Sequence, residues 1–146
     1  MGVRRLDDEE IVAVLRDNGT GVLSLNDWNG PAPHPVPVAY GYDDDHDRFV
    51  VQLEGDTSSY KKRCLQRDRE VAFTIYEESA PGETWHSVVL KGELVETSYG
   101  DAEPALAALA SNTSGTPNPI RWGDADTVTP YELRIEEWSG RAFDVA

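Results

Sequence analysis

Hydrophobic and polar residues alternate along several short segments of the chain, which is the period of a strand with one buried face. In the clearest segment, Phe49, Val51 and Leu53 would point to one side of a strand. Val50 and Gln52 would point to the other side, and Gln52 is the one polar side chain among the five. Similar patterns, bounded by glycine, proline or acidic turns, predict six strands. They cover residues 21–25, 35–42, 48–53, 70–76, 85–96 and 128–138.

Helical periodicity is confined to three short segments. In the first, Asp7 or Asp8 can cap a helix. Its apolar stripe would consist of Ile11, Val12 and Leu15. Two further helices are expected at residues 59–67 and 101–110, and a connection rich in glycine, proline and asparagine at residues 113–126.

Prolines and a glycine mark special positions within the predicted strands. Pro35 and Pro37 cannot donate to a strand ladder, so their N–H side should face an edge, a bulge or a ligand. Gly92 lies inside the longest strand and predicts a bulge or a sharp bend. Sequential hairpins with one apolar face must pack on a second sheet or close on themselves. We therefore expect one mainly β domain over residues 1–146, a small closed barrel with three short helices.

The charge of the chain limits its partners. Only 13 basic residues stand against 27 acidic ones, which gives a net charge of -14 and argues against general nucleic-acid binding. Such an acidic, lysine-poor surface would stay dissolved at high salt, so we expect a halophilic cytoplasm. The single cysteine, Cys64, also favours an intracellular setting, and a packing role is expected for it. No signal-peptide pattern and no apolar stretch long enough to span a membrane is present, so no membrane association is expected.

The few cations are concentrated in one place. Five of them follow a run of hydroxyl side chains, and together these residues are Thr57, Ser58, Ser59, Lys61, Lys62, Arg63, Arg67 and Arg69. Because a helix is predicted to begin at this point, free backbone N–H groups and the helix dipole would favour an anion there, most simply a phosphate. The alternative is an ordinary solvated helix face.

Other kinds of chemistry have little support in the sequence. His34, His46 and His86 show no ligand spacing with one another or with Cys64, so no metal site is predicted. No glycine-rich dinucleotide motif and no nucleophile elbow occurs.

An ordered set of short motifs runs through the first two thirds of the chain. The motifs are His34-Pro35-Val36-Pro37-Val38, the strand from Phe49 to Leu53, Ser59-Tyr60-Lys61, Leu65, Val71 and Ser87-Val88-Val89-Leu90-Lys91-Gly92. In this order and spacing the chain resembles the pyridoxamine 5'-phosphate oxidase-like family of FMN-binding split barrels. The likeness runs from about Val22 to Gly92 and again from Tyr131 to Arg141. It implies a six-stranded Greek-key split barrel that binds FMN.

The resemblance also implies roles for particular residues. Ser59 and Lys61 would hold the flavin phosphate, with His34 nearby and Lys62 as a second cation. The residues expected beside the isoalloxazine ring are Val36, Pro37, Val38, Val51 and Gln52. Ser87 would make a polar contact to the flavin, or be an ordinary strand hydroxyl. Trp138 would approach the flavin of the other subunit of a homodimer with the cofactor at the interface, or be a core or interface tryptophan.

The chain departs from the enzyme that gives the family its name. It lacks the C-terminal arginine and histidine signature that would hold pyridoxine, so vitamin B6 oxidation is not expected. The function implied is a flavin oxidoreductase of unknown substrate and electron donor, with no residue assigned as a general acid or base. The alternatives are a barrel that uses a deazaflavin or a haem, for which His34 and His86 are the possible axial ligands, and a non-catalytic binding or regulatory barrel.

Overall fold

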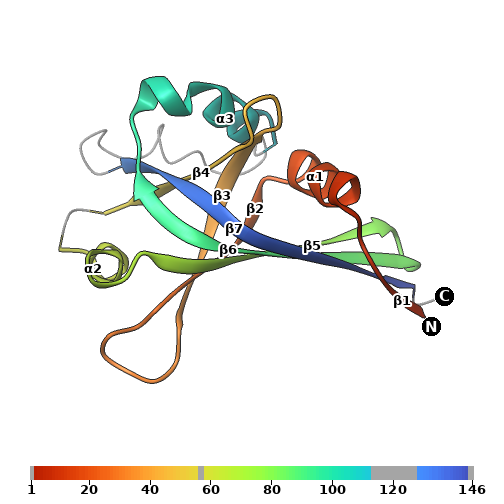
Figure 1. The fold of residues 1–146 in the computed structure, drawn as a ribbon, viewed down its shortest axis with the longest axis horizontal. Coiled ribbons are helices and arrows are strands. Elements are labelled where there is room, and N and C mark those ends of the chain that lie inside the picture. Colours follow the sequence, from red (N-terminus) through yellow and green to blue (C-terminus); the bar gives the residue numbers. More distant parts are fainter. Residues whose placement is uncertain (1, 56–57, 113–127, 145–146) are drawn as a thin grey trace.

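Antiparallel strands and three short helices make up the molecule, seen as a ribbon in Figure 1. The computed structural model describes residues 2–55, 58–112 and 128–144. The elements in chain order are β1 (Gly2–Arg5), α1 (Asp8–Asp17), β2 (Thr20–Leu25), β3 (His34–Asp43), β4 (Arg48–Glu54), α2 (Tyr60–Arg67), β5 (Glu70–Ala80), β6 (Thr84–Glu96), α3 (Tyr99–Asn112) and β7 (Val128–Asp144).

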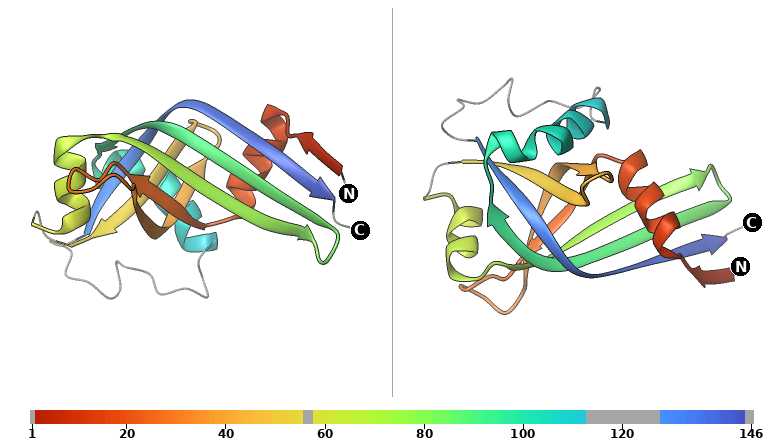
Figure 2. Two further views of the ribbon diagram at one scale, coloured as in Figure 1. Left: turned by 90° about the horizontal axis from the view of Figure 1, so that it is seen from below. Right: turned by 45° about the horizontal axis from the view of Figure 1, so that its top comes forward.

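The strands close into a barrel. Their order is β1-β7-β4-β3-β2-β5-β6, and β6 also pairs with β7, so six strands form a closed ring and β1 lies outside it on β7. Figure 2 shows the long β5, β6 and β7 running together, and the two chain ends lie close to one another. The predicted mainly β, six-stranded barrel is confirmed.

The predicted alternation along β4 is also confirmed. Phe49, Val51 and Leu53 are fully buried in the barrel core. Val50 faces the outside, where it packs against Ala102 and Ala105 of α3. The helix therefore covers the one stretch of β4 that is apolar on both faces.

The predicted boundaries differ from the structure mainly at the ends of the sheet. β5 continues past Tyr76 to Ala80, and β7 continues past Trp138 to Asp144. The short strand β1 was not predicted, because all four of its residues are exposed and carry no alternating pattern. The expected connection at residues 113–126 lies outside the described residues.

The predicted irregularity at Gly92 is a bulge between β6 and β7. Lys91 pairs with Glu137 and Gly92 pairs with Ile135, so Glu136 has no opposite residue. A Cβ atom at Gly92 would lie 2.0 Å from the backbone oxygen of Arg134. Glycine is therefore required here for the close approach of β7.

A second glycine sets how closely α3 approaches the barrel. A Cβ atom at Gly41 of β3 would lie 1.7 Å from the backbone oxygen of Ala105. We expect Gly41→Ala to lower the free energy of unfolding by about 1–3 kcal/mol, because α3 must move away. Chemical denaturation measures this loss. Gly30→Ala is the matched control, since nothing lies within 4 Å of a Cβ there, and equal stability of the two variants would contradict the prediction.

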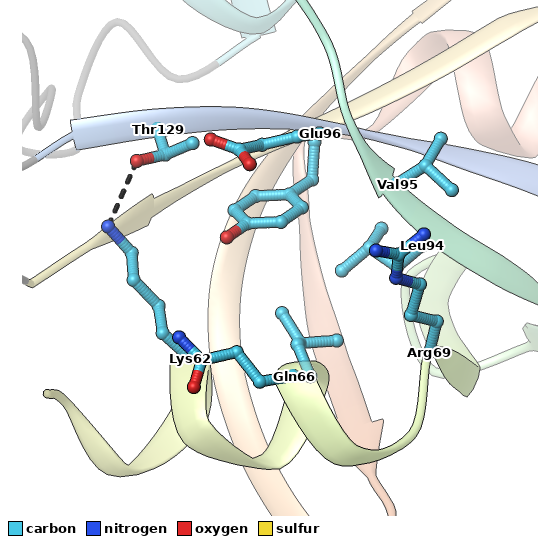
Figure 3. A pocket seen from close by; sticks show the side chains of 9 residues that line it. Lys62, Gln66, Arg69, Leu94, Val95, Glu96 and Thr129 are labelled. Atoms are coloured by element: carbon cyan, nitrogen blue, oxygen red, sulfur yellow. Dashed lines mark hydrogen bonds between the residues drawn. The ribbon is translucent and has the colours of Figure 1, made fainter. Parts of the chain in front are cut away.

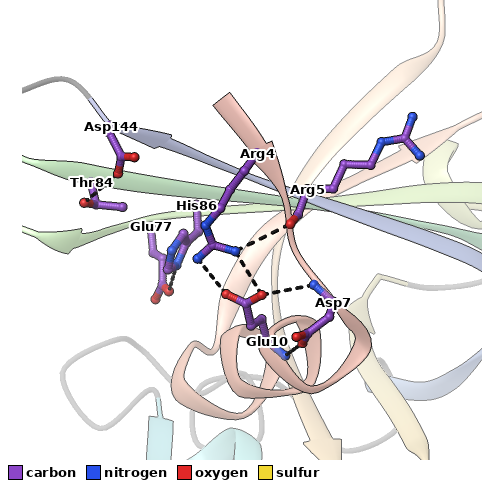
Figure 4. Close-up of polar contacts among 8 residues, drawn as sticks. All are labelled: Arg4, Arg5, Asp7, Glu10, Glu77, Thr84, His86 and Asp144. Carbon is purple, nitrogen blue, oxygen red and sulfur yellow. Dashed lines mark hydrogen bonds and ion pairs between the residues drawn. The ribbon is translucent and has the colours of Figure 1, made fainter. Parts of the chain in front are cut away.

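The start of α1 is fixed by a reciprocal capping arrangement and an ion pair (Figure 4). Asp7 accepts from the backbone N–H of Glu10, and the Glu10 carboxylate accepts from the backbone N–H of Asp7. Arg4 of β1 reaches the same carboxylate, with 2.8 Å between its Nη2 and Oε2 of Glu10. The hydrogen bond from Arg4 is the first cause that lowers the Glu10 pKa, to about 2.

This contact predicts a pH dependence. Because the Glu10 pKa is depressed in the folded state, the stabilisation is present above the ordinary value of 4.5 and is lost as the pH falls toward 2. Arg4→Met should raise the Glu10 pKa back toward 4.5, which carboxyl NMR titration would show. Arg5→Met is the control, because the Arg5 side chain has no ion pair within the described residues. An unchanged Glu10 pKa in the Arg4 variant would contradict this account.

Candidate functional site

Unsatisfied polar groups gather where α2 begins. Ser59 is the N-cap residue, yet its side chain makes no capping hydrogen bond, and its buried Oγ has no hydrogen-bond partner. The first backbone N–H groups of a helix also lack partners inside the helix. Lys61 is half-buried and makes no hydrogen bond or ion pair within the described residues. A hydroxyl, an ammonium group and a helix N-terminus are together suited to an anion.

Gly55 shapes the approach to this helix start. It adopts a φ of +120°, which L side chains rarely reach, and a Cβ there would lie 2.9 Å from the Cβ of Ser59. Lys62 donates to the backbone oxygen of Gly55 and, at 2.9 Å, to Oγ1 of Thr129 on β7. The Lys62 side chain is 6% exposed, so its ammonium group ties α2 to the end of β4 and the start of β7.

The five clustered cations do not form a single positive site. Arg63 and Arg67 lie over the ring of Trp28, with their guanidinium carbons 5.3 Å and 4.3 Å from its centroid. Lys62 and Arg69 instead line a pocket between α2, β6 and β7. Only Lys61 is left at the helix start, because successive helical residues are turned by about 100°.

Residues of the β2–β3 loop and of β3 contact the first residue of the same helix. Tyr60, the first residue of α2, donates its hydroxyl to Asp27. This hydrogen bond raises the Tyr60 pKa to about 12 and lowers the pKa of Asp27. The His34 ring meets the Tyr60 ring edge-on, with 4.9 Å between centroids. The structure thus places the His34 ring against Tyr60, the residue between Ser59 and Lys61 in the sequence.

The β3 edge that follows His34 has no strand partner within the described residues. The backbone N–H of Tyr40 donates toward β2, to Gly19 at 2.9 Å. Because the direction alternates along a strand, Pro35, Pro37 and Ala39 turn their backbone groups to the opposite edge. β3 pairs with β4 on that edge only from Tyr40 onward. The prolines therefore stand at an open edge, as predicted, and their carbonyl groups remain available to a ligand.

β4 has a matching open edge. Beyond Val51 it pairs with β7 alone among the described strands. Gln52 is 4% exposed, yet neither atom of its side-chain amide has a hydrogen-bond partner. Val51 lies in the barrel core, and Val36 and Val38 pack against the same core. Of the five residues predicted beside a flavin ring, only Pro37 and Gln52 therefore direct their side chains outward.

Two of the predicted site residues lie far from α2 within one chain. Ser87 pairs with Tyr76 and with Arg141, near the end of β7 opposite to Thr129. Trp138 packs on the core and donates its Nε1–H to Asp8 of α1 at 2.9 Å. The structure does not bring either residue to the start of α2 in the same subunit.

A patch of uncharged side chains lies on one outer face of the barrel, bordered by Lys91 opposite Ala72 and by Arg141 opposite Ser87, although the chain has a net charge of -14. At its centre Val22 pairs with Pro37 and with Thr74, and Thr74 pairs with Val89. The members of this uncharged face alternate with core residues along their strands and are half-buried or exposed. They are Thr20, Val22, Ser24, Pro35, Pro37, Ala39, Ala72, Thr74, Tyr76, Ser87 and Val89. The face is continuous from the open β3 edge to Ser87.

Cys64 is fully buried, and burial raises the pKa of its thiol, in keeping with a packing role. Among the described helices, none is both long and apolar enough to cross a membrane.

Sequence reasoning missed three residues that shape the site. Trp28 and Asp27 lie in a loop without periodicity, so nothing in the chain indicated that they contact α2. Gly55 could have been found, because a glycine between a strand and a helix often marks a positive φ.

Comparison with known proteins identifies the family. The family model described as pyridoxamine 5'-phosphate oxidase matches residues 7–142, and the chain belongs to this family of split barrels. A comparison with curated proteins gave no match.

Solved structures with the same fold are named for different cofactors. A FAD-binding protein from Mesorhizobium loti is 23% identical, with a TM-score of 0.74 over 98% of this chain and 99% of that chain. A haem-binding protein from Mycobacterium smegmatis is 20% identical, with a TM-score of 0.68 over 89% of this chain and 51% of that chain. A FAD-binding protein from the same organism is 16% identical, with a TM-score of 0.62 over 98% of this chain and 100% of that one. These likenesses establish the fold.

Proposed function

We propose that the protein is a homodimeric flavin oxidoreductase that binds FMN, with the flavin phosphate held at the start of α2. The observation that carries the proposal is the buried Ser59 hydroxyl beside the ammonium group of Lys61, neither of which has a partner among the residues that the structure describes. Hydrogen bonds from a hydroxyl, an ammonium group and helix N–H groups to a phosphate are charge-assisted and therefore strong.

The open edges of β3 and β4 supply a place for the isoalloxazine ring. The carbonyl groups of Pro35 and Pro37 and both backbone groups of Ala39 would meet the polar rim of the ring. The buried amide of Gln52 offers a donor and an acceptor on the facing strand. These groups would orient the flavin and exclude water from it, and the bound flavin would supply the hydride and electron transfer.

The uncharged face supports a homodimer. A chain with 27 acidic residues has kept eleven neighbouring outward positions free of charge, which suits a second copy better than solvent. Because the face joins the open β3 edge, the interface would lie beside the flavin. Ser87, which lies on this face, would then contact the flavin across the interface, which accounts for its distance from α2 within one chain. Trp138 points to the other side of β7, onto the core and Asp8, so its alternative role as a core tryptophan is favoured.

Spectroscopy of the purified protein tests the proposal. We expect flavin absorbance, or its appearance after addition of FMN, and FAD should be titrated in parallel. A Soret band would instead indicate haem, although the imidazole Nδ1 of His86 already lies 3.0 Å from the Glu77 carboxylate and His34 packs on Tyr60. Binding of a deazaflavin in place of FMN would overturn the cofactor assignment. Protein that binds none of the three would indicate a non-catalytic barrel.

A further inference from the structure

A pocket of about 280 Å³ lies on the side of α2 that faces the ends of β6 and β7 (Figure 3). Its apolar part comes from Leu65 and Leu94, which are nearly or fully buried. Its polar rim includes Lys62 and Arg69, which Figure 3 shows at the two sides of the α2 wall. We propose that this pocket binds a small organic carboxylate with an apolar body.

The rim of the pocket has more basic than acidic side chains, unlike the protein as a whole. Two cations, Lys62 and Arg69, face one acid, Glu96, whereas the whole chain has 13 basic and 27 acidic residues. The Arg69 guanidinium has no ion pair within the described residues. A guanidinium that is left unpaired in so acidic a protein is a natural partner for a carboxylate, which it can bind with two parallel hydrogen bonds.

Two rim groups are held in place without a ligand. The Lys62 ammonium group is fixed by Gly55 and Thr129, so little side-chain freedom would be lost on binding. Tyr131 is half-buried, and burial raises the pKa of its phenol, so at neutral pH it remains a hydrogen-bond donor. The fixed ammonium group and the neutral hydroxyl would add hydrogen bonds to a carboxylate that the Arg69 guanidinium binds.

The size of the pocket limits the ligand. Pockets for drug-sized molecules occupy roughly 300–1,000 Å³, so 280 Å³ suits a molecule of about the size of benzoate and not a nucleotide. The leucine floor favours an apolar body over an inorganic anion.

The pocket does not depend on the flavin proposal. Lys62 and Gln66 lie one turn apart on one face of α2 and Arg69 follows the end of the helix, whereas Arg63 and Arg67 lie toward Trp28. Ser59 and Lys61 are not among the residues that line it. Its occupancy can therefore be measured on the protein with or without flavin.

Titration with benzoate tests the inference, followed by amide NMR shifts or calorimetry on the full chain. Benzyl alcohol is the neutral comparison. We expect benzoate to bind at least tenfold more tightly than benzyl alcohol, with the largest shifts at the α2 C-terminal half and at residues 94–96. Arg69→Gln should weaken benzoate about tenfold or more, and Tyr131→Phe should weaken it less. Arg67→Gln, on the other face of α2, should leave it unchanged.

The outcomes separate the two proposals. Benzoate binding that survives Ser59→Ala with Lys61→Ala but not Arg69→Gln supports the pocket, whatever happens to FMN. Three results would overturn the pocket proposal. They are equal affinity for benzoate and benzyl alcohol, equal effects of Arg69→Gln and Arg67→Gln, and no binding at millimolar benzoate. Because Arg69 is exposed and makes no ion pair with any described residue, its variant should fold normally, which thermal denaturation checks.

Discussion

Replacing Ser59 and Lys61 together by alanine is expected to weaken FMN binding by at least about a hundredfold while the barrel stays folded. In the described part of the chain the Ser59 hydroxyl makes no hydrogen bond and Lys61 has no ion pair, so neither change removes a contact seen to stabilise the fold. Each group would donate a charge-assisted hydrogen bond to the phosphate, which is worth roughly 1.5–3 kcal/mol. Fluorescence titration with FMN gives the affinity, and thermal denaturation checks the fold.

A matched control separates this effect from a general loss of charge. Ser79→Ala with Lys91→Ala removes the same chemical groups from exposed positions on β5 and β6. The control should bind FMN like the parent protein. Lys62→Ala forms a second comparison, since it should lower the unfolding free energy by removing the ties to Gly55 and Thr129. An equal change in FMN affinity for the Ser59/Lys61 variant and the Ser79/Lys91 control would refute the assignment.

Val89→Glu is expected to convert the protein from a dimer to a monomer and to remove most of its flavin. Val89 lies on the uncharged face, opposite Thr74, and a dimer would bury two carboxylates there at a cost in desolvation. In the monomer the same side chain is only half-buried, so the barrel should still fold. Size-exclusion chromatography with light scattering measures the mass, and the absorbance ratio measures the flavin content.

Val3→Glu is the matched control for this experiment. Val3 is a valine on the outer strand β1 and is 59% exposed, outside the uncharged face. This variant should remain dimeric and keep its flavin. A parent protein that is already monomeric, or a Val89 variant that stays dimeric, would show that the face has another role.

Most of the barrel could be predicted from the sequence because its strands alternate strictly. One side of each strand fills a shared core, and that requirement is visible in residues such as Phe49, Val51 and Leu53. The bulge at Gly92 could be predicted for a similar reason, since a glycine inside a long strand usually has a steric cause. β1 could not, because its pairing with β7 buries none of its side chains.

The site was less predictable, because it depends on how elements meet. The five clustered cations suggested one positive site, and the helix distributes them among Trp28, a separate pocket and the helix start. No local pattern in the chain shows that Trp28 would lie under Arg67. The open edge of β3 was predictable, since Pro35 and Pro37 cannot donate hydrogen bonds. Only the structure shows that the buried side-chain polar atoms of Ser59 and Gln52 lack hydrogen-bond partners among the described residues.

The affinity ratio of FMN to riboflavin tests the central claim most directly, because the two molecules differ only by the phosphate. If the start of α2 holds that phosphate, the parent protein should bind FMN about a hundredfold more tightly than riboflavin. The Ser59→Ala, Lys61→Ala variant should then lose most of this preference, and the remainder would come from the backbone N–H groups of α2. A parent protein that binds riboflavin as tightly as FMN, or a variant that keeps the full preference, would contradict the account.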